Sequence, residues 1–164
     1  MIYVRTAGEG DLVAIRALLV ETWHATYDDI YGAGKVAEIT AEWHSPARLR
    51  VRLAEPNSEF LVADDGTALA GVAFASAQGQ TVTLRQLYVR PSMQGRGIGG
   101  MLLDEIVSCF PEANRIMLEV EPANTKAVAF YLSQGFARTG RVSDCGSMGA
   151  GIPADTYERA IVCS

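Results

Sequence analysis

The stretch that decides the fold is Val89-Arg90-Pro91-Ser92-Met93-Gln94-Gly95-Arg96-Gly97-Ile98-Gly99-Gly100, a strand end followed by a glycine-dense turn that opens a helix. Such a turn presents backbone N–H groups and the positive end of a helix dipole, which together suit a diphosphate. Glycine is needed because a Cβ would block the approach of a phosphate and would resist positive φ. Arg96 can add a charge-assisted contact. The stretch therefore predicts a binding site for a phosphorylated ligand.

The glycine spacing also matches the dinucleotide-binding fingerprint, as Gly95-x-Gly97-x-x-Gly100 with Glu119 downstream. In a dinucleotide domain, however, the strand runs directly into the glycines near the start of a parallel sheet, whereas here residues 91–94 intervene after an antiparallel meander. A Walker loop is excluded because neither Lys-Ser nor Lys-Thr follows the glycines. A nucleotide-binding oxidoreductase is therefore the weaker interpretation, and a test for NAD binding separates the two.

The spacing of apolar residues separates helices from strands on either side of this turn. Helices are expected at residues 11–23, 45–55, 97–110 and 124–135, with Asp11, Ser45 and Asn124 as N-caps. Strands are expected at residues 2–6, 60–63, 68–74, 81–89, 116–120, 136–142 and 157–162. Residues 27–38 are interpreted as a loop or a broken helix. The pattern predicts an α/β chain, and its length suits a single domain over residues 1–164.

Charge and hydropathy exclude several classes of function. The 14 Lys and Arg residues against 19 Asp and Glu give a net charge of −5, the wrong sign for a protein that neutralises many phosphates of a nucleic acid. No apolar run approaches the roughly 18 residues of a membrane helix, and residues 1–5 lack the features of a signal peptide. We therefore expect a cytoplasmic protein with neither a nucleic-acid nor a membrane partner.

The cysteines and histidines do not form a metal-binding pattern. Cys109, Cys145 and Cys163 are an odd number at wide spacing, without a CxxC pair, and are interpreted as reduced thiols. His24 and His44 are too few and too far apart in the sequence for a metal site. No metal is expected.

The glycine turn and the segments around it resemble the GCN5-related N-acetyltransferase (GNAT) family. The matching residues are Leu87-Tyr88-Val89, Gln94-x-x-Gly97-x-Gly99, Leu118-Glu119-Val120, Asn124, Ala127, Tyr131 and Gly135-Phe136. They occur in the family's order and spacing over residues 82–138. The resemblance implies the acyl-CoA N-acyltransferase (GNAT) fold, a mixed, mostly antiparallel sheet of six to seven strands with about four helices. It also implies an N-acetyltransferase that moves the acetyl group of acetyl-CoA directly to an amine.

The resemblance assigns the cofactor-binding residues. The turn comprising Gln94, Gly95, Arg96, Gly97, Ile98, Gly99 and Gly100 would hold the CoA pyrophosphate. The main chain of Leu87, Tyr88 and Val89 would pair with the pantetheine arm like an added strand, and an amide near Val89 would stabilise the oxyanion. Asn124 caps its helix and, in the family, also contacts the cofactor arm.

Catalysis requires a group that deprotonates the acceptor ammonium and a group that protonates the departing thiolate. Tyr131 occupies the family's phenol position and is the predicted general acid. Glu119 is the candidate base, because a carboxylate in an apolar strand is costly unless it is paired or functional. It also matches a catalytic glutamate of the ribosomal-protein N-terminal acetyltransferases. A rim carboxylate paired with Arg85 or Arg115 is equally compatible with the sequence.

The base assignment stays open in a second respect. Some members of the family place Glu or His at positions 83 and 85, which are Thr83 and Arg85 here. Deprotonation through water by Glu119, Glu121 or His24 is therefore an alternative, whereas Gln86 cannot serve as a base.

The acceptor side is read from residues 21–38, which wall the acceptor cleft in the family. Trp23, His24 and Tyr27 are the candidate substrate contacts, and aromatic side chains with acids suit a cationic amine. A tryptophan at helical spacing from an apolar residue, as Trp23 is from Leu19, is more often a core residue than a substrate contact. The glycine-rich segment 144–151 is interpreted as a flap or a long hairpin connection.

One alternative belongs to a different class of function: a non-catalytic acyl-CoA-binding module that regulates a partner. Such a module needs the glycine turn but not Tyr131, so the presence of Tyr131 and Glu119 favours the enzyme. A homodimer through the sheet edge or the C-terminal strands is expected from the resemblance.

Overall fold

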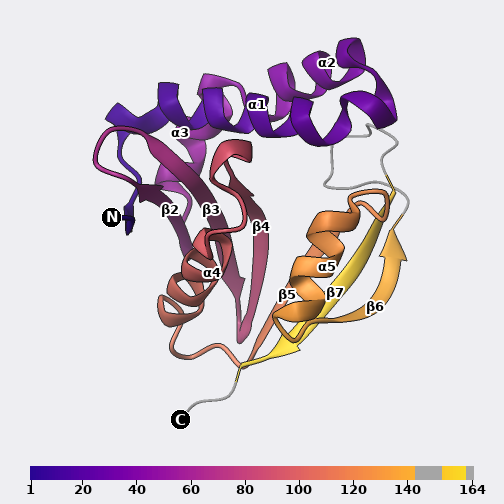
Figure 1. Ribbon diagram of the computed structural model, residues 1–164. Helices are drawn as coiled ribbons and strands as arrows, with labels where there is room; N and C mark the ends of the chain where they lie inside the picture. The colour runs from indigo at the N-terminus through magenta and orange to yellow at the C-terminus, as the bar shows by residue number, and fades with distance from the viewer. Residues whose placement is uncertain (143–152, 162–164) are drawn as a thin grey trace.

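The computed structural model describes residues 1–142 and 153–161, in which a mixed sheet carries helices on both faces (Figure 1). The strands are β1 (Tyr3–Thr6), β2 (Ser58–Asp64), β3 (Leu69–Gln78), β4 (Thr81–Val89), β5 (Arg115–Val120), β6 (Ala137–Val142) and β7 (Ala154–Ala160). The helices are α1 (Leu12–Tyr31), α2 (Ala33–Trp43), α3 (Pro46–Ala54), α4 (Ile98–Ser108) and α5 (Thr125–Ser133), with 3-10 turns at Glu9–Asp11 and Pro91–Met93. The expected α/β class is confirmed.

Within the described parts of the chain, seven strands form one sheet in the order β1-β2-β3-β4-β5-β7-β6. Every neighbouring pair is antiparallel except β4 and β5, which are parallel. The prediction of a mixed, mostly antiparallel sheet of six to seven strands is therefore confirmed.

The central parallel pair separates partway along its length. Pairing between β4 and β5 runs from Thr81↔Arg115 only as far as Leu84↔Leu118. The register of β4 against β3 shifts at the same level, because Ala75 pairs with Leu84 but Phe74 pairs with Gln86. Arg85 is thus the extra residue of a β-bulge, which bends a strand locally. Beyond it, β4 and β5 diverge toward α1, as Figure 1 shows.

Each face of the sheet buries its own hydrophobic cluster. On one face α1 and α3 pack with Ile15, Leu18 and Leu49 against Phe60 and Val72. The other face is covered by α4 and α5 and contains these buried residues among others: Leu61, Ala73, Leu84, Leu102, Ile116, Leu118 and Tyr131. The alternation of side chains along a strand produces the two faces. Figure 1 shows α4 in front of β2 to β4 and α5 in front of β5 to β7.

The N-terminal helices differ from the prediction. The segment predicted as a loop or broken helix is a broken helix. Helix α1 continues to Tyr31, Gly32 adopts a φ of 86°, and α2 follows. The described residues therefore contain five α-helices, where the sequence predicted about four. Asp11 does not cap α1 through its side chain. Its carboxylate instead accepts from the Gly8 amide at 2.8 Å and pairs with Arg5 at 2.8 Å.

The other predicted caps are confirmed. The Arg48 amide donates to Ser45 Oγ at 3.3 Å, and the Ala127 amide donates to Asn124 Oδ1 at 3.3 Å. The last strand begins at Ala154, three residues before its predicted start at 157. The predicted flap at 144–151, the strand end at 162, Cys145 and Cys163 lie outside the described residues. None of the helices described combines the length and the apolar character that crossing a bilayer requires.

Candidate active site

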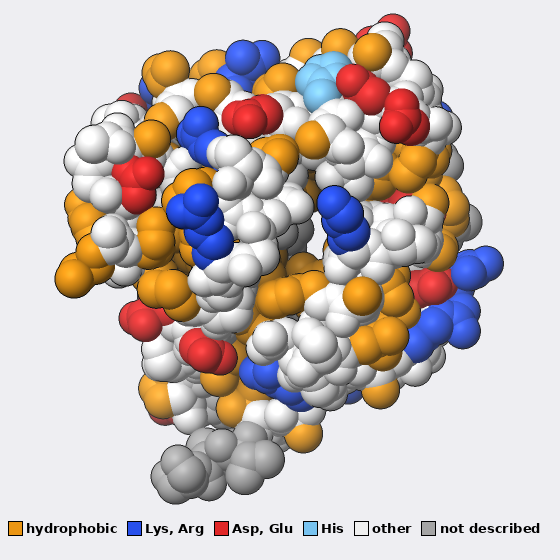
Figure 2. Space-filling model, viewed as in Figure 1, with side chains coloured by type: hydrophobic (Ala, Val, Ile, Leu, Met, Phe, Trp, Pro, Cys, Tyr) orange, Lys and Arg blue, Asp and Glu red, His pale blue; other side chains and the backbone are white. Residues whose placement is uncertain are grey.

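A cavity of about 1440 Å³ opens where β4 and β5 diverge. It is lined by the glycine turn and the first turn of α4, by both diverging strands, by α5, and by α1, α2 and α3. Figure 2 shows the face hollowed at its centre, between the part of the molecule that carries α4 and the part that carries α5. One continuous cavity therefore joins the predicted cofactor segment to the N-terminal helices.

The glycine turn has the backbone conformation that the sequence predicts. Gly95 and Gly97 have φ of 81° and 80°, the left-handed region that residues with a Cβ rarely adopt. Gly97 is the N-cap of α4, so the first N–H groups of that helix lack partners within it. A Cβ on Gly99 would come within 3.2 Å of the Phe130 ring. The turn thus presents a helix N-terminus to the cavity in a form that suits a diphosphate.

The edge of β4 that faces the gap is available for main-chain pairing. The Arg90 amide donates to the Ala70 carbonyl of β3 at 2.8 Å. Because main-chain groups alternate sides along a strand, the Val89 amide points the other way, toward the gap. Consistent with this, the Val89 carbonyl accepts from Gln94 Nε2 at 3.1 Å. Leu87, Tyr88 and Val89 all line the cavity, as an extended ligand pairing with β4 requires.

The predicted turn residues fall into three groups. Five of them line the cavity: Gln94, Gly95, Gly97, Gly99 and Gly100. The four glycines have no side chain that would obstruct a ligand. The Gln94 side chain donates to the Val89 carbonyl and so connects the turn to β4. Ile98 also lines the cavity, but its side chain is buried in the core. Arg96 is exposed and does not belong to the cavity lining, so its predicted contact to a ligand has no support in the structure.

Tyr131 is buried on α5 and lines the cavity. Its ring contacts Phe130 and Phe136 edge-on, with centroids 5.2 and 5.5 Å away. Burial, reinforced by the nearby Tyr27, raises the pKa of the Tyr131 hydroxyl well above its ordinary value. The hydroxyl therefore stays protonated at neutral pH and can only donate its proton to a stronger base.

Glu119 lies on β5 where that strand has left β4, is exposed, and lines the cavity. The two arginines that the sequence offered as partners bond elsewhere. Arg115 pairs with Glu158 at 2.9 Å, and Arg85 Nε donates to Ser76 Oγ at 2.9 Å. These partners of both arginines therefore lie away from Glu119.

Glu121, two residues later, is a buried carboxylate in the same cavity. Tyr31 donates to Glu121 Oε2 at 2.5 Å, and the Ala123 amide donates to Oε1 at 3.2 Å. Asn124 Nδ2 lies 3.5 Å from the Tyr27 hydroxyl and donates to it, in addition to its capping role. The hydrogen bonds of Tyr31 and Tyr27 thus connect the C-terminal half of α1 to the end of β5 and the residues that follow it.

The three predicted acceptor contacts lie differently. Trp23 and Tyr27 are buried, line the cavity, and have ring centroids 4.5 Å apart, and Trp23 Nε1 donates to the Tyr88 hydroxyl at 3.1 Å. Both residues therefore belong to the hydrophobic core and also line the cavity. His24 points elsewhere: its Nδ1 lies 2.6 Å from Asp28 Oδ1, and it is not part of the cavity lining.

A polar group at the α2–α3 end of the cavity was not predicted from the sequence. His44, Arg52, Glu55 and Gln86 line this end. His44 is 1% exposed, and burial lowers its pKa to about 3. The Ser45-Pro46 cap signal places His44 at a helix junction, but no local pattern indicates that it is buried against Gln86, 42 residues later.

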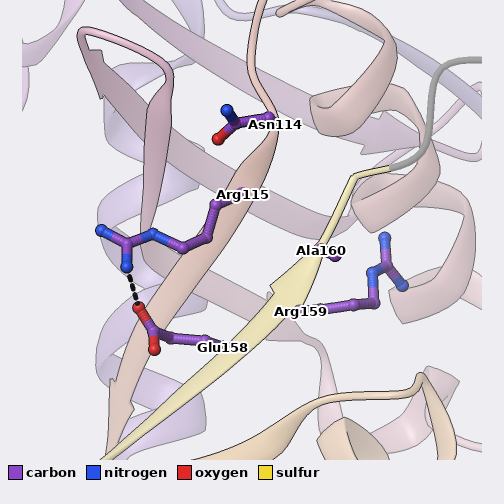
Figure 3. Close-up of a pocket in the computed structure, with 5 residues that line it drawn as sticks. All are labelled: Asn114, Arg115, Glu158, Arg159 and Ala160. Carbon is purple, nitrogen blue, oxygen red and sulfur yellow. Dashed lines mark ion pairs between the residues drawn. The ribbon is translucent and has the colours of Figure 1, made fainter.

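A second, smaller hollow of about 240 Å³ lies at the opposite end of β5 (Figure 3). It is lined by Asn114, Arg115, Glu158, Arg159 and Ala160. Two of these lining residues, Arg115 and Glu158, form an ion pair, drawn as a dashed line in Figure 3. None of these residues belongs to the glycine turn or to the large cavity, so the hollow has no part in the candidate site.

Part of the chain is similar to curated proteins, among them the following two. The N-alpha-acetyltransferase RimI of Mycobacterium tuberculosis is 37% identical over 99 residues, which are 58% of this chain and 62% of that protein. The peptidyl-lysine N-acetyltransferase YjaB of Salmonella typhimurium is 39% identical over 62 residues, 37% of this chain and 41% of that protein. The alignments thus span less than two thirds of either relative.

Among solved structures, the PaiA N-acetyltransferase of Thermoplasma acidophilum in complex with coenzyme A shares the fold. It superposes with a TM-score of 0.87 at 22% identity, over 98% of this chain and 99% of that one. A model of the acetyltransferase (GNAT) family matches residues 14–136, which contain the glycine turn, both diverging strands and α5. The chain belongs to the acetyltransferase (GNAT) family.

Proposed function

We propose that the protein is an N-acetyltransferase that binds acetyl-CoA along the glycine turn and β4 and passes its acetyl group directly to an amine. The observation that supports the proposal is one continuous cavity whose lining includes the turn, the open edge of β4 and Tyr131. Family membership supports the same reaction.

The residues present fit the cofactor. Left-handed glycines at positions 95 and 97 expose main-chain N–H groups to a pyrophosphate, and the unpaired edge of β4 beyond Leu84 can take an extended pantetheine arm. Bound acetyl-CoA supplies an activated thioester. The Val89 amide, which faces the gap, is placed to stabilise negative charge on a carbonyl oxygen there.

Proton transfer is divided between two sides of the cavity. The Tyr131 hydroxyl, kept protonated by burial, donates its proton to the departing thiolate. Glu119, exposed to the cavity on β5, takes a proton from the acceptor ammonium directly or through water. Glu121 is the second candidate for this role, and its side chain accepts a hydrogen bond from Tyr31.

The acceptor is an amine of a small molecule or of a peptide N-terminus. Resemblance to an N-alpha-acetyltransferase and to a peptidyl-lysine N-acetyltransferase favours a peptide or protein amine. The protein is proposed to act as one domain in the cytoplasm, where its cysteines stay reduced. A homodimer through the sheet edge or the C-terminal strands stays a prediction, which light scattering of the purified protein tests.

Thiol release from acetyl-CoA across a panel of amines, amino acids, polyamines and short peptides tests the proposal. Binding of CoA is measured first by calorimetry on the same sample. Turnover with at least one amine supports the enzyme. Binding of CoA without turnover on any acceptor would favour the alternative, a non-catalytic acyl-CoA-binding module, and absence of CoA binding would contradict both.

A further inference from the structure

The α2–α3 end of the cavity contains polar atoms that have no partner in the structure. We call this region the α3 subsite and define it by the cavity-lining residues His44, Arg48, Arg52, Glu55, Arg85 and Gln86. Within the described chain, His44 Nε2, Arg52 Nη1, Glu55 Oε2 and Gln86 Oε1 are buried without a hydrogen bond. Leaving such atoms unpaired costs about 1–3 kcal/mol each. Their concentration at one end of a large cavity indicates a place where a ligand completes the bonding.

The hydrogen bonds that do exist define what the unpaired atoms can accept. Gln86 Nε2 lies 3.3 Å from His44 Nδ1, and with the amide in this orientation it donates to Nδ1. The proton of the neutral imidazole is then on Nε2, which becomes a buried donor at this end of the cavity. Arg52 Nη2 donates to the Trp43 carbonyl at 2.8 Å, which leaves Nη1 as a second donor.

Electrostatics at this end favours an anion. Arg48, Arg52 and Arg85 line the α3 subsite together with one carboxylate, Glu55. Burial lowers the pKa of Arg52, and the like charges of Arg48 and Arg85 lower it further, while Tyr88 and Glu55 act in the opposite direction. Arg52 in turn lowers the pKa of His44 in addition to the effect of burial. An acceptor carrying negative charge relieves this repulsion, whereas a cationic polyamine increases it.

We propose that the α3 subsite binds a carboxylate of the acceptor, so that the substrate is an amine that also carries an acidic group. Arg52 Nη1 and His44 Nε2 donate to the two carboxylate oxygens. Gln86 Oε1 and Glu55 Oε2 accept from N–H groups beside that carboxylate, as an amino acid or a peptide provides. This inference rests on the proposed acetyl transfer for the identity of the acceptor, but binding at the subsite is measurable without it.

The test compares ligands that differ only in the acid group. Glycine, β-alanine, 4-aminobutyrate and 6-aminohexanoate are titrated by calorimetry into the CoA-saturated protein, each against its carboxamide. Ala-Glu-Ala-amide is titrated against Ala-Gln-Ala-amide in the same way. We expect at least one carboxylate to bind at least tenfold more tightly than its carboxamide.

Two variants assign the preference to the subsite. Arg52→Gln removes the donor, and Gln86→Glu adds a negative charge at nearly constant volume; each is expected to reduce the preference to less than twofold. Arg50→Gln is the matched control on α3, because Arg50 is exposed, pairs with Glu9 at 2.8 Å and does not line the cavity. It should keep the preference of the wild type.

The outcomes separate this inference from the proposed function. Equal binding of every carboxylate and carboxamide to the wild type would overturn the subsite, even if the protein turns over amines. A preference that survives in both Arg52→Gln and Gln86→Glu would overturn it as well. A preference that is lost in both variants supports the subsite whether or not thiol release is seen, since thiol release tests acetyl transfer alone.

Discussion

Tyr31 at the end of α1 donates a hydrogen bond of 2.5 Å to the buried carboxylate of Glu121 at the end of β5. One helical turn earlier, Tyr27 accepts from Asn124, and another turn earlier Trp23 donates to Tyr88 on β4. A single helix face therefore contacts both strands that diverge around the cavity. The fixed separation of β4 and β5 depends in part on these contacts.

Removal of the Tyr31 hydroxyl tests this bridge. Tyr31→Phe leaves a buried carboxylate with one bond fewer, which is expected to cost about 1–3 kcal/mol of unfolding free energy. Urea denaturation measures the loss. In a double-mutant cycle, the loss for Tyr31→Phe combined with Glu121→Gln should be smaller than the sum of the two single losses, because both changes act on the same interaction. Fully additive losses would show that the bond contributes nothing.

The left-handed glycine at the start of α4 is expected to be indispensable for cofactor binding. Gly97→Ala forces a side chain into positive φ, at a cost of about 1–2 kcal/mol, and displaces the amides that face the cavity. We expect CoA affinity to fall at least tenfold by calorimetry. Gly66→Ala is the matched control: Gly66 has a φ of 98° but lies in the β2–β3 turn, outside the cavity lining. Equal effects of the two changes on CoA affinity would contradict the assignment.

Burial of His44 predicts a dependence of stability on pH. The folded-state pKa is about 3 against an ordinary value of 6.5, so the unfolded chain binds a proton first as the pH falls. The stabilisation is complete above pH 6.5 and is lost on acidification toward the folded pKa. Between pH 6.5 and 4.5 the loss from this one group is about 2 kcal/mol. The unfolding free energy measured by urea denaturation should therefore fall by about 2 kcal/mol more in the wild type than in His44→Gln over this pH range. An equal fall in both proteins would contradict the burial of a neutral imidazole.

The two carboxylates on β5 are expected to act differently. Glu119→Gln should lower kcat at least tenfold with CoA affinity unchanged, because Glu119 faces the cavity without contributing to the glycine turn. Glu121→Gln should affect stability more than kcat, since its carboxylate is buried and bonded to Tyr31 and to the Ala123 amide. Thiol-release kinetics on both variants measures the difference. The opposite pattern would assign the base to Glu121.

How much the sequence predicts depends on how far apart the interacting residues lie. The glycine turn, the Ser45 and Asn124 caps and the β2–β3 hairpin are local, and each is confirmed. The mixed, mostly antiparallel sheet follows from the family resemblance, whereas the order of its strands and the gap beyond Leu84 come from the structure. Helix α2 was not separated from a loop because Gly32 and Gly34 interrupt its apolar pattern, although only Gly32 has positive φ.

Contacts between distant segments could not be predicted. Tyr31 and Glu121 are 90 residues apart, and His44 and Gln86 are 42 apart, with no local signal joining either pair. For the same reason His24 was predicted at the acceptor wall, although it pairs with Asp28 on its own helix. A ligand contact is predicted for Arg96 because it is a positive charge within the turn, but the residue is not part of the cavity lining.

The most direct test of the central claim, that Tyr131 acts as an acid in a cavity shared with the cofactor turn, is the rate of thiol release by Tyr131→Phe. The change removes one oxygen from a buried side chain and leaves its ring contacts with Phe130 and Phe136. The account predicts a fall in kcat of at least tenfold on the best acceptor, with CoA affinity within twofold of the wild type by calorimetry. An unchanged kcat, or a fall explained entirely by lost CoA binding, would contradict it.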